Sequence, residues 1–227
     1  MSQSASPQSL AYLLSLPLLQ GMSQKDVFAM AERIPMNFQR LEAGKTIVRQ
    51  GDACDLLIFL IDGEVAFHKR SDDHTYGLTE HLRAPMVFEP ECLFGMHTRY
   101  AHTISALTDV RLFVVEKRDV RDVLLDFPTF RVNLLNQISY RAQHRDYELW
   151  RNQRAGLQWQ FVDFLLDRCV RPAGYKELQI KMSRLGRELD TTRLNISHLL
   201  GSLREKKLIE TGRERIIIPH FENLVNL

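Results

Sequence analysis

The chain has 227 residues, of which 44% are hydrophobic and 26% charged, a composition typical of globular domains. Its formal net charge of +2 is too small to indicate a nucleic-acid partner by itself. Three cysteines without a CxxC pair (Cys54, Cys92 and Cys169) argue against a disulfide framework and a structural zinc site. No apolar run reaches the ~20 residues that cross a bilayer. We therefore expect a soluble, cytoplasmic protein.

The N-terminal region is predicted to be helical after a disordered start. Residues 1–9 are rich in Ser and Gln, a composition typical of disordered segments. Apolar residues at helical spacing follow from Leu10 to Ile34 and are interrupted at residues 17–22, so we expect two short helices. The second helix has a start signal, because Ser23 precedes Asp26 by three residues, a spacing close to that of a capping box.

Between Asn37 and Glu116 the sequence changes to short runs of β-branched and aromatic residues, separated by turn signals. Many such runs at near-regular spacing predict an antiparallel β-roll of the jelly-roll kind. We assign residues 10–128 to this domain, which we interpret as a sensor. The expected strands are Thr46–Val48, Leu56–Ile61, Val65–His68, Thr103–Leu107 and Arg111–Val115.

A long helix is predicted over residues 129–155, where neither Gly nor Pro occurs. It would be about twice as long as the mean helix of ~11–12 residues. Apolar and small residues spaced by three and four form an imperfect heptad seam, so the helix needs a partner surface. The seam alone fits packing on its own domain as well as dimerisation. The residues assigned to a dimer interface are Val132, Leu135, Ser139, Ala142 and Leu149.

Residues 156–227 form the predicted second domain, with a hinge near Gly156. A helical run over Trp159–Val170 opens this domain and ends at a loop containing Pro and Gly. Further along the chain, Ser183 is placed to cap a helix that runs to Leu189.

The most specific pattern follows that helix. After a short polar turn, Thr192 is placed to cap a second helix over Arg193–Lys206. One side of this helix is apolar and comprises Ile196, Leu199, Leu200 and Leu203. The other side is polar and carries no acidic residue. Two strands, Leu208–Glu210 and Arg215–Ile218, would then form a hairpin, so the segment predicts a winged helix-turn-helix and the whole chain an α+β fold.

The polar side of the second helix suggests a DNA-binding surface. In helix-turn-helix proteins, the N-terminal residues of this helix enter the major groove. Arg193 is suited to a bidentate pair with guanine, and His198 is suited to donate to a base or a phosphate. Short polar side chains suit the phosphate contacts that set the register. The predicted DNA-binding residues are Ser183, Thr192, Arg193, Asn195, Ser197, His198 and Arg213.

Three segments in order carry a resemblance to a known family. They are LPLLQGMSQKDV, the stretch from Phe38 to Val65 with its Gly-containing turns, and SRLGRELDTTRLNISHLLGSLREKKLIE. On these segments the chain from Leu16 to Leu224 resembles the Crp–Fnr family of bacterial transcription regulators. The resemblance implies a cyclic-nucleotide-binding-like β-roll, a homodimer joined by the long helix, binding to a palindromic DNA operator, and contact with RNA polymerase.

The chain departs from the family at the cyclic-nucleotide cassette. Members that respond to cyclic nucleotides carry a Gly-Glu pair and a later Arg-Ser or Arg-Thr pair. Here Pro90 precedes Glu91, Tyr100-Ala101 stands at the second position, and Arg99 is one residue out of step. A cyclic phosphate needs a cation and free backbone N–H groups, so we do not expect cyclic AMP as effector. The candidate effector-binding residues are Glu91, Cys92, Arg99 and Tyr100.

Several alternatives stay open. The resemblance implies that an iron–sulfur sensor would carry several cysteines near the N-terminus, and such a sensor is disfavoured because no cysteine precedes Cys54. Haem is an alternative cofactor for gas or redox sensing, since Cys92, the Met96-His97 pair and His102 are ligand types that hold haem iron. A module that has lost DNA binding is the other alternative. An enzyme is disfavoured because the sequence has no Gly-rich phosphate loop, nucleophile elbow or spaced metal ligands.

The second helix, Arg193–Lys206, corresponds to the recognition helix of the family, the helix that enters the major groove, and it also departs from the family pattern. Leu194 and His198 replace the usual Glu and second Arg, so the operator is expected to differ.

Overall fold

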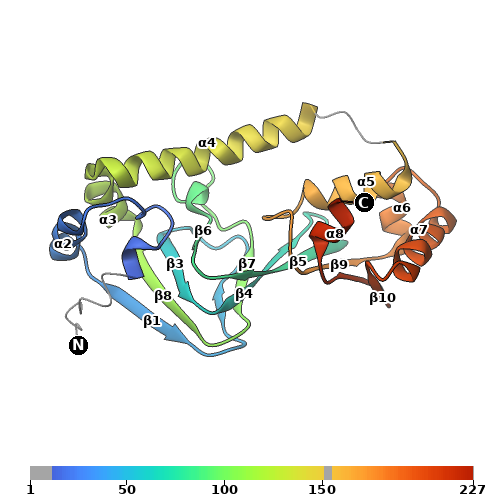
Figure 1. Cartoon of the computed structure of the whole chain (residues 1–227), viewed down its shortest axis with the longest axis horizontal. Coiled ribbons are helices and arrows are strands. Elements are labelled where there is room, and N and C mark those ends of the chain that lie inside the picture. Colours follow the sequence, from blue (N-terminus) through green and yellow to red (C-terminus); the bar gives the residue numbers. More distant parts are fainter. Residues whose placement is uncertain (1–11, 151–154, 227) are drawn as a thin grey trace. The chain divides into compact units, whose positions relative to one another are not determined.

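A computed structural model describes residues 12–150 and 155–226, which form two compact units (Figure 1). The first unit comprises Met1–Val65 and Arg83–His144, and the second comprises Ala66–Leu82 and Arg145–Leu227. The segment 1–9, predicted to be disordered, lies outside the described residues. Among the described residues, no helix combines the length and the apolar character needed to cross a membrane.

The first unit contains an antiparallel β-roll, as predicted. One sheet has the strand order β1-β8-β3-β6, and β2 pairs antiparallel with β7. These strands are β1 (Asn37–Leu41), β2 (Thr46–Val48), β3 (Leu56–Asp62), β6 (Met86–Phe88), β7 (Thr103–Ala106) and β8 (Val110–Glu116). All four strands predicted in this unit are present within one or two residues of the expected ends, while β1 and β6 were not predicted.

The aromatic core explains the central position of β3 and β8. Four consecutive residues of β3, from Leu57 to Leu60, are buried, so both faces of the strand are covered. Phe59 stacks on Phe113 of β8, with 5.7 Å between the ring centroids. The turn after β3 requires glycine, because Gly63 has a φ of 98° and a Cβ there would lie 2.6 Å from a backbone oxygen.

Helices cover this roll at the N-terminal and C-terminal ends of the unit. The capping box predicted at Ser23 is present, since its hydroxyl accepts from the Asp26 N–H and the Asp26 carboxylate accepts from the Ser23 N–H. It begins helix α2. The helical elements of the unit are α2 (Gln24–Arg33), η1 (Pro90–Cys92), α3 (Lys117–Asp122), η2 (Leu124–Asp126) and the first part of α4 (Pro128–Trp150).

The long helix α4 begins at Pro128, a favourable first residue because its missing N–H has no helical acceptor. Phe130 and Leu134 are buried in the core of the first unit. The other side of the helix is solvent-exposed: Val132 is 52% exposed and Leu135 57%. Ser139 and Ala142 are exposed as well, while the Leu149 side chain lies outside the described residues. The predicted seam is therefore exposed from residue 132 to residue 142.

The second unit is built on a sheet with the strand order β10-β11-β9-β5-β4. Its strands are β4 (Glu64–Arg70, of which Ala66 onward belongs to this unit), β5 (Tyr76–Arg83), β9 (Lys176–Ile180), β10 (Glu210–Gly212) and β11 (Arg215–Ile218). The helices are α5 (Leu157–Leu166), α6 (Met182–Glu188), α7 (Arg193–Glu205) and α8 (Phe221–Val225). They share one hydrophobic core with the sheet.

Two features of this unit differ from the sequence-based expectation. Helix α5 ends at Leu166, four residues before the predicted end, because the backbone N–H of Val170 is bound by the Glu80 carboxylate instead of a helical carbonyl. In addition, the β4–β5 hairpin belongs to the compact unit of the C-terminal helices. The pattern of the sequence did not indicate that grouping.

Candidate functional site

Helices α6 and α7 form a helix-turn-helix. The turn between them is tight: Gly186 of α6 approaches it so closely that a Cβ would lie 2.8 Å from the Thr191 carbonyl oxygen. Asp190 completes the turn with a φ of 47°, a left-handed conformation that Asp tolerates better than most residues. Thr192 then caps α7 by accepting a hydrogen bond from the Asn195 N–H at 3.2 Å, which confirms the predicted N-cap.

The predicted cap at Ser183 is wrong. Helix α6 begins at Met182, immediately after β9, so its N-cap residue is Lys181 and Ser183 lies in the first turn. Ser183 is exposed there. Its hydroxyl therefore lies on the surface of the helix-turn-helix, and its contact with a phosphate stays a prediction.

The burial pattern of α7 separates a core side from a solvent side. Ile196, Leu200 and Leu203 are buried, and Leu199 packs against the same core. The opposite side carries the predicted DNA-binding residues of this helix, all of which are exposed: Arg193, Asn195, Ser197 and His198. The Asn195 amide also donates to the Thr191 hydroxyl at 3.0 Å, so this side chain is oriented by the turn.

The wing is present, but its first strand begins later than predicted. We expected a strand over Leu208–Glu210, whereas β10 spans Glu210–Gly212. The reason is the end of α7: Lys207 has a φ of 58° and the Leu208 N–H bonds back to the Leu203 carbonyl, which closes the helix in a left-handed cap. The second strand, β11, has the predicted bounds, and Arg213 is exposed between the two strands.

A basic groove lies between the start of α6, the start of α7 and the wing. It has a volume of about 340 Å³. Three of the predicted residues line it, namely Ser183, Arg193 and Arg213. Two further cations, Lys181 and Arg215, line the groove together with a single acidic residue, Glu214. Guanidinium groups beside a hydroxyl suit a phosphate oxygen, so the groove has the chemistry of a nucleic-acid backbone contact.

Arg215 is the best-anchored of these cations. Its guanidinium donates to the Glu177 carboxylate at 2.6 Å, and this contact keeps the pKa of Arg215 above its usual value. Burial alone would raise the pKa of Glu177, but hydrogen bonds from Arg215 and its neighbours lower it. The pair fixes β11 against β9 at the base of the wing.

The first unit holds two acid–base contacts that were not predicted from the sequence. Glu89 is buried, and its carboxylate bonds to the His102 ring nitrogen Nδ1 and to the Ala101 N–H. Glu91, two residues later, forms an ion pair with Arg141 of α4. One signal for these contacts is present in the sequence, namely a glutamate on each side of Pro90. Only Glu91 was predicted to belong to a site.

The four candidate effector-binding residues lie in different environments. Tyr100 is only 3% exposed and donates to the Leu56 carbonyl at 2.7 Å; burial raises its pKa. Arg99 is exposed and donates to the Gly51 carbonyl at 2.7 Å. Glu91 engages Arg141, and Cys92 beside it is partly exposed. Their role in effector binding stays a prediction.

The cysteine and histidine side chains near these four residues differ in burial. Burial raises the pKa of the Cys54 thiol to about 11, which keeps it protonated at neutral pH. Within the described residues, no three His, Cys, Asp or Glu side chains gather in a group that could hold a metal ion. His97 is exposed, and His102 is bound to Glu89.

A β-roll followed by a winged helix-turn-helix defines a class of DNA-binding regulator with a sensor domain. Comparison with protein families agrees: residues 38–127 match the cyclic nucleotide-binding domain, and residues 161–227 match the Crp-like helix-turn-helix domain. Together these matches cover more than half of the chain. The chain belongs to the Crp family of transcription regulators.

The chain is also similar to regulators from several bacteria. The global nitrogen regulators of Synechococcus elongatus and of a Nostoc species are 27% and 26% identical, covering 82% and 81% of this chain and 87% and 86% of their own. Among solved structures, the Thermus thermophilus catabolite activator protein is 19% identical, with a TM-score of 0.51 over 92% of this chain and 96% of its own. The c-di-GMP-responsive regulator CLP of Xanthomonas campestris is 15% identical, with a TM-score of 0.51 over 87% and 99%.

Proposed function

We propose that this protein is a homodimeric, sequence-specific DNA-binding regulator whose affinity for an operator is controlled by a small effector other than cyclic AMP. The single observation that carries DNA binding is the exposed polar side of α7 beside the basic groove. Arg193 belongs to both features, since it starts α7 and lines the groove. In this position a bidentate contact with guanine contributes ~1–3 kcal/mol of discrimination.

The test of DNA binding starts from a library of random duplexes, because the operator sequence is unknown. Duplexes retained by the purified protein are sequenced, and the affinity for the selected duplex is measured at two salt concentrations. We expect the affinity to fall steeply with salt, since phosphate contacts release counterions. Failure to enrich any sequence would contradict the proposal.

Arg193→Ala provides the specific test. We expect this variant to lose about tenfold or more in affinity for the selected duplex and to retain non-specific binding. Arg40→Ala is the matched control, because Arg40 is an exposed arginine on β1 in the other unit. Equal losses in the two variants would contradict a base-reading role for Arg193.

The proposal of a homodimer rests on the exposed side of α4. Val132 and Leu135 are large apolar side chains more than half exposed, followed by the small residues Ser139 and Ala142 at heptad spacing. A second copy of the helix would cover this side and place two recognition helices on a palindrome. We expect Leu135→Glu to give monomers in sedimentation equilibrium, whereas Gln143→Glu, an exposed residue off the seam, leaves the dimer intact. A Leu135→Glu dimer would contradict this interface.

The proposal that cyclic AMP is not the effector is supported by the environment of the cassette positions. Tyr100 has no charge to offer a phosphate and uses its hydroxyl inside the fold. One oxygen of the Glu91 carboxylate, the acidic residue of the cassette, is paired with Arg141. Isothermal titration calorimetry with cyclic AMP is expected to show no binding at millimolar concentrations. We also propose, from the family assignment, that the DNA-bound dimer contacts RNA polymerase.

A further inference from the structure

An apolar side chain stands on the polar side of α7. Leu194, the second residue of the helix, is 65% exposed, whereas Leu200 and Leu203 of the core side are buried. Helical geometry explains the difference: Leu203 lies about two and a half turns after Leu194 and therefore points to the opposite side of the helix. A single exposed leucine is ordinary on a protein surface, so the surroundings of Leu194 decide what it does.

The neighbours of Leu194 are residues suited to contact DNA. Arg193 precedes it and lines the basic groove, and His198, one turn later on the same side of α7, is exposed. Gly201 continues this side of the helix. A Cβ built on Gly201 would meet no atom of the described residues within 4 Å beyond its own helix backbone, so packing within the chain does not require glycine there. Because glycine weakens a helix but lets another molecule approach the backbone, this side of α7 is suited to close contact with a partner.

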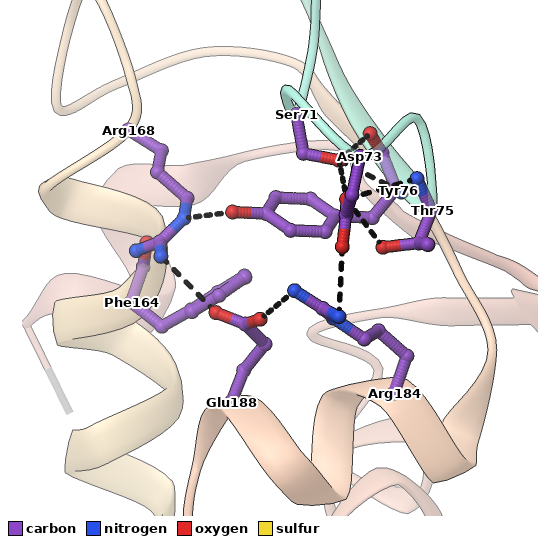
Figure 2. Close-up of polar contacts among 8 residues, drawn as sticks. All are labelled: Ser71, Asp73, Thr75, Tyr76, Phe164, Arg168, Arg184 and Glu188. Atoms are coloured by element: carbon purple, nitrogen blue, oxygen red, sulfur yellow. Dashed lines mark hydrogen bonds and ion pairs between the residues drawn. The ribbon is translucent and has the colours of Figure 1, made fainter.

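Helix α6, which precedes the turn before α7, is fixed by ion pairs (Figure 2). The Arg184 guanidinium lies 2.9 Å from the Asp73 carboxylate and 2.6 Å from the Glu188 carboxylate. The Ser71 and Thr75 hydroxyls donate to the Asp73 carboxylate at 2.7 and 2.8 Å and orient it. The start of α7 is therefore held on an anchored helix, so its side chains need little ordering when they bind a base.

A leucine side chain distinguishes the bases because it has no hydrogen-bond donor or acceptor. In the major groove, the edges of guanine, cytosine and adenine present polar groups, and only thymine adds an apolar group, its C5-methyl. A leucine that covers a polar base atom removes water from that atom and gives it no hydrogen bond, which is unfavourable. A leucine against the thymine methyl buries two apolar groups together, which is favourable.

We infer that Leu194 recognises the C5-methyl group of a thymine in the base pair next to the guanine bound by Arg193. Consecutive Cα atoms are about 3.8 Å apart, close to the ~3.4 Å between successive base pairs, so the two residues reach adjacent pairs. Because this role of Leu194 rests on the proposed function, it specifies the DNA of that function: each half-site contains a T·A pair beside a G·C pair.

Deoxyuridine tests the contact, because it differs from thymine only by the missing C5-methyl group. The guanine bound by Arg193 is identified first, as the one whose replacement no longer lowers the affinity in Arg193→Ala. At the neighbouring pair, we expect deoxyuridine to lower the affinity of the wild-type protein about fourfold for each thymine replaced, the effect of one buried methyl-sized group. Leu194→Ala is expected to bind both duplexes equally. Leu107→Ala is the matched control, since Leu107 is a 38% exposed leucine in the other unit, and it retains the fourfold difference.

5-Methylcytosine provides the complementary test, because it returns the methyl group to the same place in a different base pair. The T·A pair is replaced by C·G, with and without the methyl group on cytosine. We expect the wild-type protein to prefer the methylated duplex about fourfold and Leu194→Ala to show no preference. The Tm of Leu194→Ala is expected to be unchanged because the side chain is exposed, so the loss of preference is assigned to the contact with DNA.

Three results would overturn the role of Leu194. They are a selected duplex without thymine beside the guanine, equal affinity of the wild-type protein for thymine and deoxyuridine, and the same methyl dependence in Leu194→Ala as in the wild-type protein. If the affinity depends on the guanine through Arg193 but not on the methyl group, only the role of Leu194 falls. If no duplex is enriched at all, the proposed function falls with it.

Discussion

Replacing Glu80 with Gln removes a charge that the fold has placed entirely out of water. The Gln side chain keeps the size of Glu80 and an oxygen that accepts from the Val170 N–H. Its NH2 group replaces the oxygen that accepts from Lys176 and from the Arg171 N–H, so Lys176 loses its counter-charge. Breaking a buried pair on one side costs about 3–5 kcal/mol, because the remaining ion is buried alone. We expect the free energy of unfolding of the C-terminal unit to fall by about that amount.

A double variant separates this electrostatic cost from a loss of packing. In Glu80→Gln with Lys176→Met no charge remains, and Met approximates the shape of the lysine chain. Its main loss is the charged hydrogen bond from Lys176 to the Ala173 carbonyl, about 1.5–3 kcal/mol. The double variant is therefore expected to be more stable than the single variant, although it carries one more substitution.

Native-state hydrogen exchange is the suitable assay, because it reports the opening free energy of each segment separately. The amides of α5 and α7 report on the C-terminal unit, and those of β3 and β8 report on the sensor roll as an internal control. The reasoning would be refuted if Glu80→Gln changed the opening free energy of α7 by less than about 1 kcal/mol, or if the double variant were as unstable as the single variant.

Three further predictions concern local features. Thr192→Ala removes the cap that accepts from the Asn195 N–H and is expected to destabilise α7 by about 0.5–2 kcal/mol in urea unfolding, whereas Thr192→Ser retains most of the stability. Gly63→Ala forces a side chain onto a φ of 98° and against the Asp109 carbonyl, so a Tm lowered by several degrees is expected; an unchanged Tm would contradict this turn geometry. Because the pKa of Asp73 is lowered to about 2 from 3.8, its contribution to stability is present above pH 3.8 and is lost as the pH falls through about 2. Carboxyl NMR titration of Asp73 is the measurement, and a midpoint near 3.8 would refute its contacts.

The helix-turn-helix was the part best predicted from sequence, because its determinants are local. The cap at Thr192 and the spacing of Ile196, Leu200 and Leu203 lie within one helix, where neighbours in space are three or four residues apart. The errors in this region were also local. The sequence did not show that α6 starts directly after β9, which displaced the cap from Ser183 to Lys181.

The β5–β9 contact could not be predicted in the same way. Strand β5 contains Glu80, and β9 begins with Lys176; each residue taken alone indicates an exposed surface. The two residues are 96 positions apart in the sequence, and only their pairing allows both charged side chains to be buried. The Glu91–Arg141 ion pair is another example, since its partners come from a turn in the roll and from α4.

The amino-acid sequence by itself determined the class of fold, the helix-turn-helix and the exposed polar side of α7. Periodicity, caps and turn residues encode these features within a few positions of each other. The tertiary structure alone decided that the β4–β5 hairpin joins the DNA-binding unit and that Glu80 and Lys176 stabilise it from inside. The physical reason is that the energy of a buried charge depends on its partner and its exposure to water, and distant parts of the chain supply both.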